Sequence, residues 1–320
     1  MTLQSMEDYF RDRVKIEARR PDRMRASVTF SAELQGPPEA GHGGGVAAML
    51  FELVCLFRDE RGGAAGVPRP VRIDATLYRE VPLETPLPAE VLPADGSWHS
   101  RILRGDRPVA EAVVSPMEGP LPPLPPETRR RWEESNRPAH EVPGYEFCLA
   151  CGLRNARGAQ VRFDYNDTLV WKRLTPQPHF RCADGSLFPG YLCIVCDEMG
   201  WWLGALRLGE CGLSNRVTVC LGRPVVHGVP LLVLGDRSAV RTLDPKGRIW
   251  HTQATIVTED WLPVATAEVQ FAGSRAFTKV MLPRFLTDED PAKVCRVFPR
   301  YAARDDALES TDGTIEPGAA

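Results

Sequence analysis

The residues best suited to chemistry are a histidine beside glycines, and carboxylates that stand alone in apolar runs. His42 opens the sequence His-Gly-Gly-Gly, and an apolar run over residues 46–57 follows it with one charged residue, Glu52. Glycines let another group approach the start of a helix closely, and the free main-chain N–H groups there bind anions. Burying a carboxylate is costly unless it is paired or used. This stretch therefore predicts either a turn and core helix with a satisfied glutamate, or one half of a reaction site.

A second stretch repeats this pattern in the other half of the chain. Residues 188–206 place Phe-Pro-Gly before another apolar run, whose charges are the adjacent Asp197 and Glu198. Glu198 follows Glu52 by 146 positions in a chain of 320 residues. Such self-similarity indicates a duplicated unit, made of a glycine turn, a buried helix and several antiparallel strands.

Composition and charge exclude several classes of protein. A net charge of −3 and a pI near 6.1 give no reason to expect nucleic acid or a membrane as partner. The apolar runs fall short of the roughly 18 residues that a membrane-spanning helix needs. The charged N-terminus lacks the apolar core of a signal peptide. Nine cysteines, several of them in apolar runs, suit reduced and buried thiols. We therefore expect a cytoplasmic protein.

The order of these elements predicts an α+β fold with two antiparallel sheets, each wrapping a central buried helix. The first unit is expected over residues 1–115 and opens with a short amphipathic helix over residues 1–20. A proline-rich linker over residues 116–142 is interpreted as an extended spacer. The second unit is expected over residues 143–280, and residues 281–320 form a C-terminal extension that is partly disordered.

The two halves resemble the hotdog-fold acyl-CoA thioesterases. In the second half, CLACGLRNARG (148–158) is similar to their opening C-x-x-C-G motif, DEMGWW (197–202) to their central helix, and GRPVVHGVPL (222–231) to the start of a strand. In the first half, GHGGG (41–45) and REVPLETPL (79–87) carry the resemblance. The resemblance implies a double hotdog, in which two hotdog units in one chain pack as the homodimers of this family do.

The resemblance also implies a site across the interface of the two units. The His-Gly-Gly turn of one unit would bind the thioester oxygen, and an acid on the other central helix would be nucleophile or general base. The first half keeps the turn, but its acid position falls on Phe51, with Glu52 one residue later, a shift that the extra Gly45 could absorb. The second half keeps the acids but has Phe188-Pro-Gly in place of the turn. We therefore expect one working site and a degenerate reciprocal one. The candidate catalytic residues are Asp197, Glu198, His42 and Glu52, and the candidate substrate-binding residues are Gly43, Gly44, Gly45, Gly190, Tyr191 and Trp202.

Plainer interpretations compete with these assignments. The aromatic residues near the acids are expected mainly to fill the core, although a pocket lined by them would suit an apolar or aromatic acyl group. Cys148-x-x-Cys151 and Cys193-x-x-Cys196 have the spacing of zinc ligands. The second pair lies in an apolar helix, and the first belongs to the opening motif of the resembled family. We therefore predict neither a metal nor a cofactor.

Three functions are compatible with the sequence. The leading hypothesis is hydrolysis of an acyl-CoA or acyl-carrier-protein thioester. The second is dehydration or hydration of a 3-hydroxyacyl or enoyl thioester, as in double-hotdog dehydratase domains, although the spacing H-x-x-x-G-x-x-x-x-P does not follow His42. The third is acyl binding without catalysis. A homodimer of double hotdogs is a further expectation.

Overall fold

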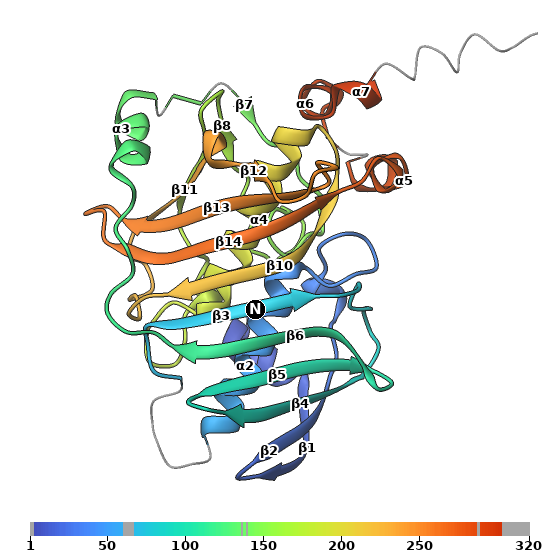
Figure 1. The fold of residues 1–320 in the computed structure, drawn as a ribbon, viewed down its shortest axis with the longest axis vertical. Helices are drawn as coiled ribbons and strands as arrows, with labels where there is room; N and C mark the ends of the chain where they lie inside the picture. The colour runs from blue at the N-terminus through green and yellow to red at the C-terminus, as the bar shows by residue number, and fades with distance from the viewer. Residues whose placement is uncertain (1–2, 60–66, 136, 139, 287–288, 303–320) are drawn as a thin grey trace, which may run out of the picture.

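The first half of the chain folds into a curved antiparallel sheet around one long helix, α2 (Gly43–Asp59) (Figure 1). The computed structural model describes residues 3–59, 67–135, 137–138, 140–286 and 289–302. A short helix, α1 (Met6–Arg11), opens the chain. The strands of this half are β1 (Val14–Arg20), β2 (Arg23–Val28), β3 (Val71–Leu77), β4 (Leu87–Ala94), β5 (Ser97–Arg104) and β6 (Arg107–Pro116). Hydrogen bonds join them in the order β1-β2-β4-β5-β6-β3.

The second half repeats this arrangement around the helix α4 (Pro189–Leu208). Its strands are β7 (His140–Glu141), β8 (Asp164–Tyr165), β9 (Leu169–Leu174), β10 (Gly212–Leu221), β11 (Leu231–Asp236), β12 (Arg241–Thr242), β13 (Ile249–Thr258) and β14 (Pro263–Gly273). They are ordered β10-β14-β13-β11-β9-β8-β7, and β12 pairs with β13. Strands β2, β4, β5, β6 and β3 therefore correspond in order to β9, β11, β13, β14 and β10, and each helix follows the first strand of its set. The predicted duplication and the α+β class are confirmed.

The two halves meet edge to edge, where β3 pairs with β10 in antiparallel register. Across this junction Arg216 donates from Nε and Nη2 to the two carboxylate oxygens of Asp74, at 2.8 and 2.7 Å. Thr218 Oγ1 donates to the same carboxylate at 3.0 Å. The two sheets expected from the sequence are thus halves of one continuous sheet. Joining them covers two strand edges that would otherwise be open to pairing with another chain.

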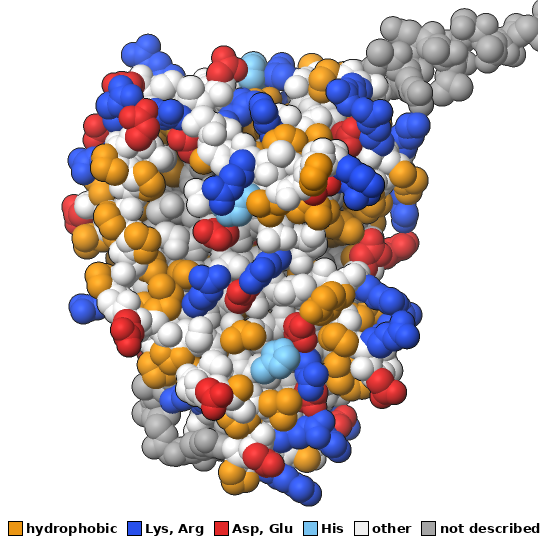
Figure 2. Space-filling model, in the orientation of Figure 1, with side chains coloured by type: hydrophobic (Ala, Val, Ile, Leu, Met, Phe, Trp, Pro, Cys, Tyr) orange, Lys and Arg blue, Asp and Glu red, His pale blue; other side chains and the backbone are white. Residues whose placement is uncertain are grey.

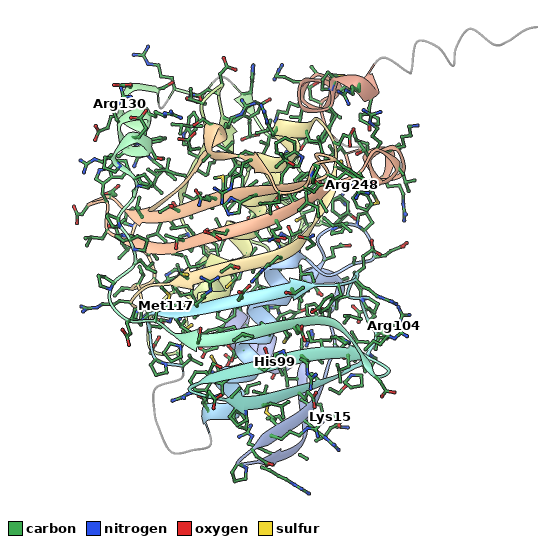
Figure 3. The ribbon with its side chains drawn as sticks, in the orientation of Figure 1. Lys15, His99, Arg104, Met117, Arg130 and Arg248 are labelled. Atoms are coloured by element: carbon green, nitrogen blue, oxygen red, sulfur yellow. The ribbon has the colours of Figure 1, made fainter. Side chains whose placement is uncertain are left out.

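The outer face of this sheet carries charged side chains of both signs, with hydrophobic side chains between them (Figure 2). Figure 2 shows side chains of both signs spread over the face that carries β13, β14, β10, β3, β6 and β5. His99 on β5 lies on this face (Figure 3), and its Nε2 is 3.2 Å from Glu111 Oε2 on β6. Its neighbours Trp98 and Ser100 are buried on the other side of the strand. Such alternation places the core against the inner face, where the helices lie.

The two helices also pack on each other at the N-terminus of α2. A Cβ atom on Gly44 would lie 2.5 Å from the main-chain oxygen of Cys193 and 2.8 Å from Cα of Ile194, both in α4. Only glycine permits this approach of one backbone to another. No helix in the described part of the chain combines the length and apolarity that crossing a bilayer requires.

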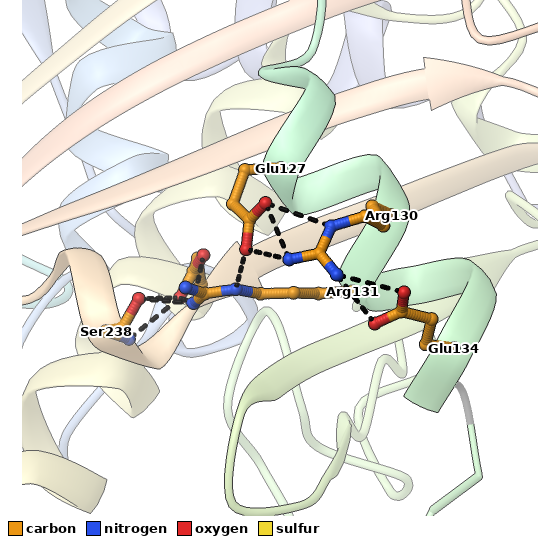
Figure 4. A network of polar contacts seen from close by, with 6 residues as sticks. Glu127, Arg130, Arg131, Glu134 and Ser238 are labelled. Atoms are coloured by element: carbon orange, nitrogen blue, oxygen red, sulfur yellow. Dashed lines mark hydrogen bonds and ion pairs between the residues drawn. The ribbon is translucent and has the colours of Figure 1, made fainter.

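The segment expected to be an extended spacer contains a helix, α3 (Pro126–Ser135). Proline suits the first helical position. Ion pairs four residues apart, Glu127–Arg131 and Arg130–Glu134, support the helix on its exposed face (Figure 4). Arg131 also reaches Asp236 of β11 at 3.0 Å. This ion pair therefore anchors the helical part of the linker to the second half.

The two ends of the chain differ from expectation in detail. The opening segment forms α1 followed by β1, which pairs with β2, instead of one amphipathic helix. The C-terminal extension forms α5 (Arg275–Phe285), α6 (Pro291–Val297) and α7 (Pro299–Ala302). The disorder predicted for the C-terminal tail, residues 305–320, falls outside the described residues.

Candidate active site

A cavity of about 240 Å³ lies where the two halves meet. His42 and Gly43 line it from the N-terminus of α2, and Asp197, Glu198 and Trp202 line it from α4. Residues of both halves therefore face one space. Its apolar lining includes Val46, Leu77, Val81, Trp201, Leu213 and Met281.

Glu198 is held in place by two ring systems. Trp202 Nε1, one helical turn further along α4, donates to Glu198 Oε1 at 2.8 Å. His42 Nε2 lies 3.2 Å from the other carboxylate oxygen, Oε2. All three side chains are buried. A carboxylate of the second half thus orients the imidazole of the first.

Asp197 lies on the opposite side of the same imidazole. Its Oδ2 accepts a hydrogen bond from the main-chain N–H of Gly44 at 2.6 Å and lies 3.5 Å from His42 Nδ1. Gly45 N–H also points to Nδ1, at 3.3 Å. The start of a helix leaves main-chain N–H groups without acceptors inside the helix, and here one of them binds the acid of the other half.

Two thiols complete the cluster. Cys148 and Cys151 line the cavity from the turn that precedes β8, and both are buried. One donor atom each of Cys148, His42 and Glu198 lies within 4.8 Å of the other two. Ala150 N–H donates to the Cys148 sulfur at 3.3 Å.

Burial and charge shift the proton affinities of these groups in opposite directions. Burial raises the pKa of Asp197, against the lowering effects of His42, Ser214 and the Gly44 amide. Burial lowers the pKa of His42, but Cys148, Glu198 and Asp197 outweigh it and hold this pKa well above its usual value. Burial also raises the pKa of Cys148, yet the hydrogen bonds from Cys151 and His42 outweigh burial and lower this pKa overall. The imidazole therefore sits among groups that favour its cationic form.

Solved structures of similar fold are known for this chain, although no similar sequence was found. No protein-family model matches the sequence, and no curated protein matches it. A structure from Novosphingobium aromaticivorans assigned as a thioesterase has a TM-score of 0.52 at 18% identity, covering 81% of this chain and 98% of that one. The dehydratase domain from the CurJ module of curacin polyketide synthase has a TM-score of 0.54 at 11% identity, covering 82% and 98%. A structure from Thermobifida fusca assigned as a thioesterase II has a TM-score of 0.51 at 13% identity, covering 83% and 98%. The chain has a double-hotdog fold.

The reciprocal position of this double hotdog is filled by α1. Arg11 Nε lies 2.6 Å from Glu52 Oε1, and the Phe10 ring packs on Phe188 with centroids 5.3 Å apart. Phe188 stands nine residues before Asp197, as His42 stands nine before Phe51. A phenylalanine and a guanidinium thus occupy the place that corresponds to the cavity.

The sequence-predicted site residues divide between these two places. His42, Gly43, Asp197, Glu198 and Trp202 line the cavity, and the adjoining Gly44 and Gly45 bond to Asp197 and His42 through their amides. Glu52, Gly190 and Tyr191 are not brought to it. Glu52 pairs with Arg11, Gly190 packs near Ala48 of α2, and the Tyr191 ring lies 4.7 Å from that of Phe180.

Sequence reasoning missed the thiols as members of the cluster. The Cys-x-x-Cys spacing was visible, but it could not place Cys148 beside His42, more than 100 residues away. Trp201, expected mainly in the core, lines the cavity and donates from Nε1 to Gly212 O at 2.8 Å. Arg79 lines the cavity too.

Proposed function

We propose that this double hotdog hydrolyses an acyl thioester, of coenzyme A or of an acyl carrier protein, in the cavity between its halves. One observation carries the proposal. The Asp197 carboxylate of the second half lies 2.6 Å from the Gly44 amide and 3.5 Å from the His42 ring of the first half. An acid, an imidazole and the N-terminus of a helix therefore meet at one buried, concave place.

The proposed reaction uses these groups in separate roles. The thioester carbonyl lies at the His42–Gly43 turn, where the N-terminus of α2 stabilises the developing oxyanion; one such donor is worth about 3 kcal/mol. Asp197 accepts a proton from the attacking water, whose oxygen bonds to the carbonyl carbon. When the carbon–sulfur bond breaks, His42 gives a proton to the departing thiolate. Glu198, fixed by Trp202, positions His42 for this transfer.

The cavity lining indicates the kind of acyl group. Leu77, Trp201, Trp202 and Leu213 offer apolar and aromatic surface beside the acids. This lining suits an apolar or aromatic acyl chain. Arg79 supplies a cation in the same cavity for an anionic part of the thiol carrier.

A second candidate is dehydration of a 3-hydroxyacyl thioester. The observation in its favour is that a histidine of the first half and an acid of the second half face each other, with His42 Nδ1 3.5 Å from Asp197 Oδ2. In that reaction His42 would take the α-proton and Asp197 would protonate the departing hydroxyl group. Hydrolysis is preferred because the spacing H-x-x-x-G-x-x-x-x-P of double-hotdog dehydratase domains does not follow His42.

A panel of acyl-CoA and acyl-carrier-protein thioesters separates the candidates. Thiol release is followed with a thiol reagent, and interconversion of hydroxyacyl and enoyl thioesters is followed by absorbance and mass spectrometry. We expect thiol release with apolar or aromatic acyl groups. Interconversion without thiol release would replace the proposal by dehydration, and binding without turnover of any substrate would reject both.

A further inference from the structure

Three potential metal ligands converge in the cavity, one from each of three separate segments of the chain. One donor atom each of His42, Cys148 and Glu198 lies within 4.8 Å of the other two, and all three residues are buried. Cys151 offers a fourth donor, because its buried thiol lines the same cavity three residues after Cys148. The segments are the N-terminus of α2, the turn before β8, and α4.

We propose that His42, Cys148, Cys151 and Glu198 bind one zinc ion. Thiolate sulfur, imidazole nitrogen and carboxylate oxygen are the ligands that zinc takes in proteins. Zinc–ligand bonds of about 2.0 to 2.3 Å in a tetrahedron place the ligand atoms about 3.3 to 3.8 Å apart. His42 Nε2 and Glu198 Oε2 are 3.2 Å apart, and the donor atoms of His42, Cys148 and Glu198 all lie within 4.8 Å of one another. The Cys-x-x-Cys spacing is also that of zinc-binding turns.

The groups around His42 are those that usually surround a metal-binding histidine. Such a histidine usually donates its second ring N–H to a carboxylate, which fixes the ring and makes the coordinating nitrogen more basic. His42 presents Nε2 to Glu198, while Nδ1 lies 3.5 Å from Asp197 Oδ2. The contact from Gly45 N–H to Nδ1, at 3.3 Å, is given up when Nδ1 carries the proton. Trp202 anchors Oε1 of Glu198, and Ala150 N–H anchors the Cys148 sulfur.

Zinc binding replaces the thiol protons of Cys148 and Cys151, which pass to the buffer. It also occupies His42 Nε2 and Glu198, which the proposed hydrolysis uses. Metal loading and hydrolysis therefore compete for the same side chains. Zinc binding needs only these four ligands and does not depend on the proposed hydrolysis. A protein without thioesterase activity would therefore still bind the metal.

The test measures the metal itself in the full-length chain. Protein purified under reducing conditions is stripped with a chelator, reloaded with zinc, and measured by inductively coupled plasma mass spectrometry. A parallel sample is titrated with cobalt(II), whose thiolate charge-transfer and tetrahedral absorption bands report the ligands. We expect one zinc per chain, and cobalt bands typical of a four-coordinate site with thiolate ligands.

Matched cysteine variants assign the ligands. Cys148→Ser and Cys151→Ser should each lower zinc affinity at least tenfold and reduce the thiolate band, whereas Cys220→Ser and Cys295→Ser, at half-buried thiols elsewhere, should bind as the parent does. Circular dichroism shows whether each variant is folded. If a variant does not fold, the cobalt spectrum of the parent still tests the proposal. A parent that takes up no zinc and gives no thiolate band would overturn the proposal. Equal binding by a folded Cys148→Ser variant would overturn it as well.

Discussion

The Asp197 carboxylate accepts a hydrogen bond from the Gly44 amide at 2.6 Å, although the two residues belong to different halves of the chain. This contact exists because α2 begins directly against the backbone of α4. It places an acid of one hotdog at the helix N-terminus of the other. The arrangement of the whole cavity depends on that approach.

Gly44→Ala should therefore damage both packing and the site. The added methyl group would meet the main-chain oxygen of Cys193 at 2.5 Å and Asp197 Cβ at 2.8 Å, and backbone cannot move aside cheaply. We expect a loss of about 2 to 3 kcal/mol in the free energy of unfolding, measured by urea denaturation. Gly45→Ala is the matched control, since its methyl group meets the flexible end of Leu149 at 2.8 Å. Equal losses in both variants would contradict the assigned role of Gly44.

Glu52 should make stability depend on pH. Burial raises its pKa from 4.5 to about 7, against the lowering effect of Arg11. Because the folded state holds this proton more tightly than the unfolded state, the stability it contributes is present below pH 4.5 and is lost as pH rises through 7. Between pH 5 and pH 8 the unfolding free energy of the parent should fall by about 2 kcal/mol more than that of Glu52→Gln.

The comparison that isolates Glu52 is the difference between parent and variant at each pH. Other groups titrate in the same range, but they are common to both proteins and cancel in this difference. Parallel stability curves from pH 5 to pH 8 would show that Glu52 has an ordinary pKa in the folded protein.

Trp202→Phe should separate the role of Trp202 in positioning Glu198 from its role in packing the core. The substitution keeps an aromatic ring but removes the Nε1–H that donates to Glu198 at 2.8 Å. We expect a stability loss of about 1 to 3 kcal/mol and a lower kcat for thiol release. Trp201→Phe breaks a bond of the same length, to Gly212 O, without touching Glu198. It should cost similar stability and leave kcat closer to that of the parent. The assignment would be wrong if Trp201→Phe lowered kcat more than Trp202→Phe.

Local patterns predicted most of the elements. The apolar runs at residues 46–57 and 188–206 form α2 and α4, because a long and mostly apolar run that follows a glycine-containing turn favours a buried helix. The repeat of strand segments predicted the duplication, which the matching strand orders confirm.

Long-range contacts could not be predicted in this way. The sequence pattern does not show that β3 pairs with β10, because the residue pattern of a strand is the same whether or not its edge is paired with another strand. The pairing of Arg11 with Glu52, and the meeting of Cys148 with His42, depend on how segments far apart in the chain fold over the two helices. The helix in the linker was hidden by the prolines that surround it.

The proposed hydrolysis depends on an acid of one half, Asp197, acting at the turn of the other half. Its most direct test compares thiol release by the parent, Asp197→Asn and Glu52→Gln on the best thioester of the panel. Asp197→Asn should lower kcat/KM by about a factor of 100 to 10,000, because the group that activates water is removed. Glu52→Gln should keep most of the activity, because Arg11 and Phe10 fill the reciprocal position. Loss of activity in Glu52→Gln with full activity in Asp197→Asn would contradict the account.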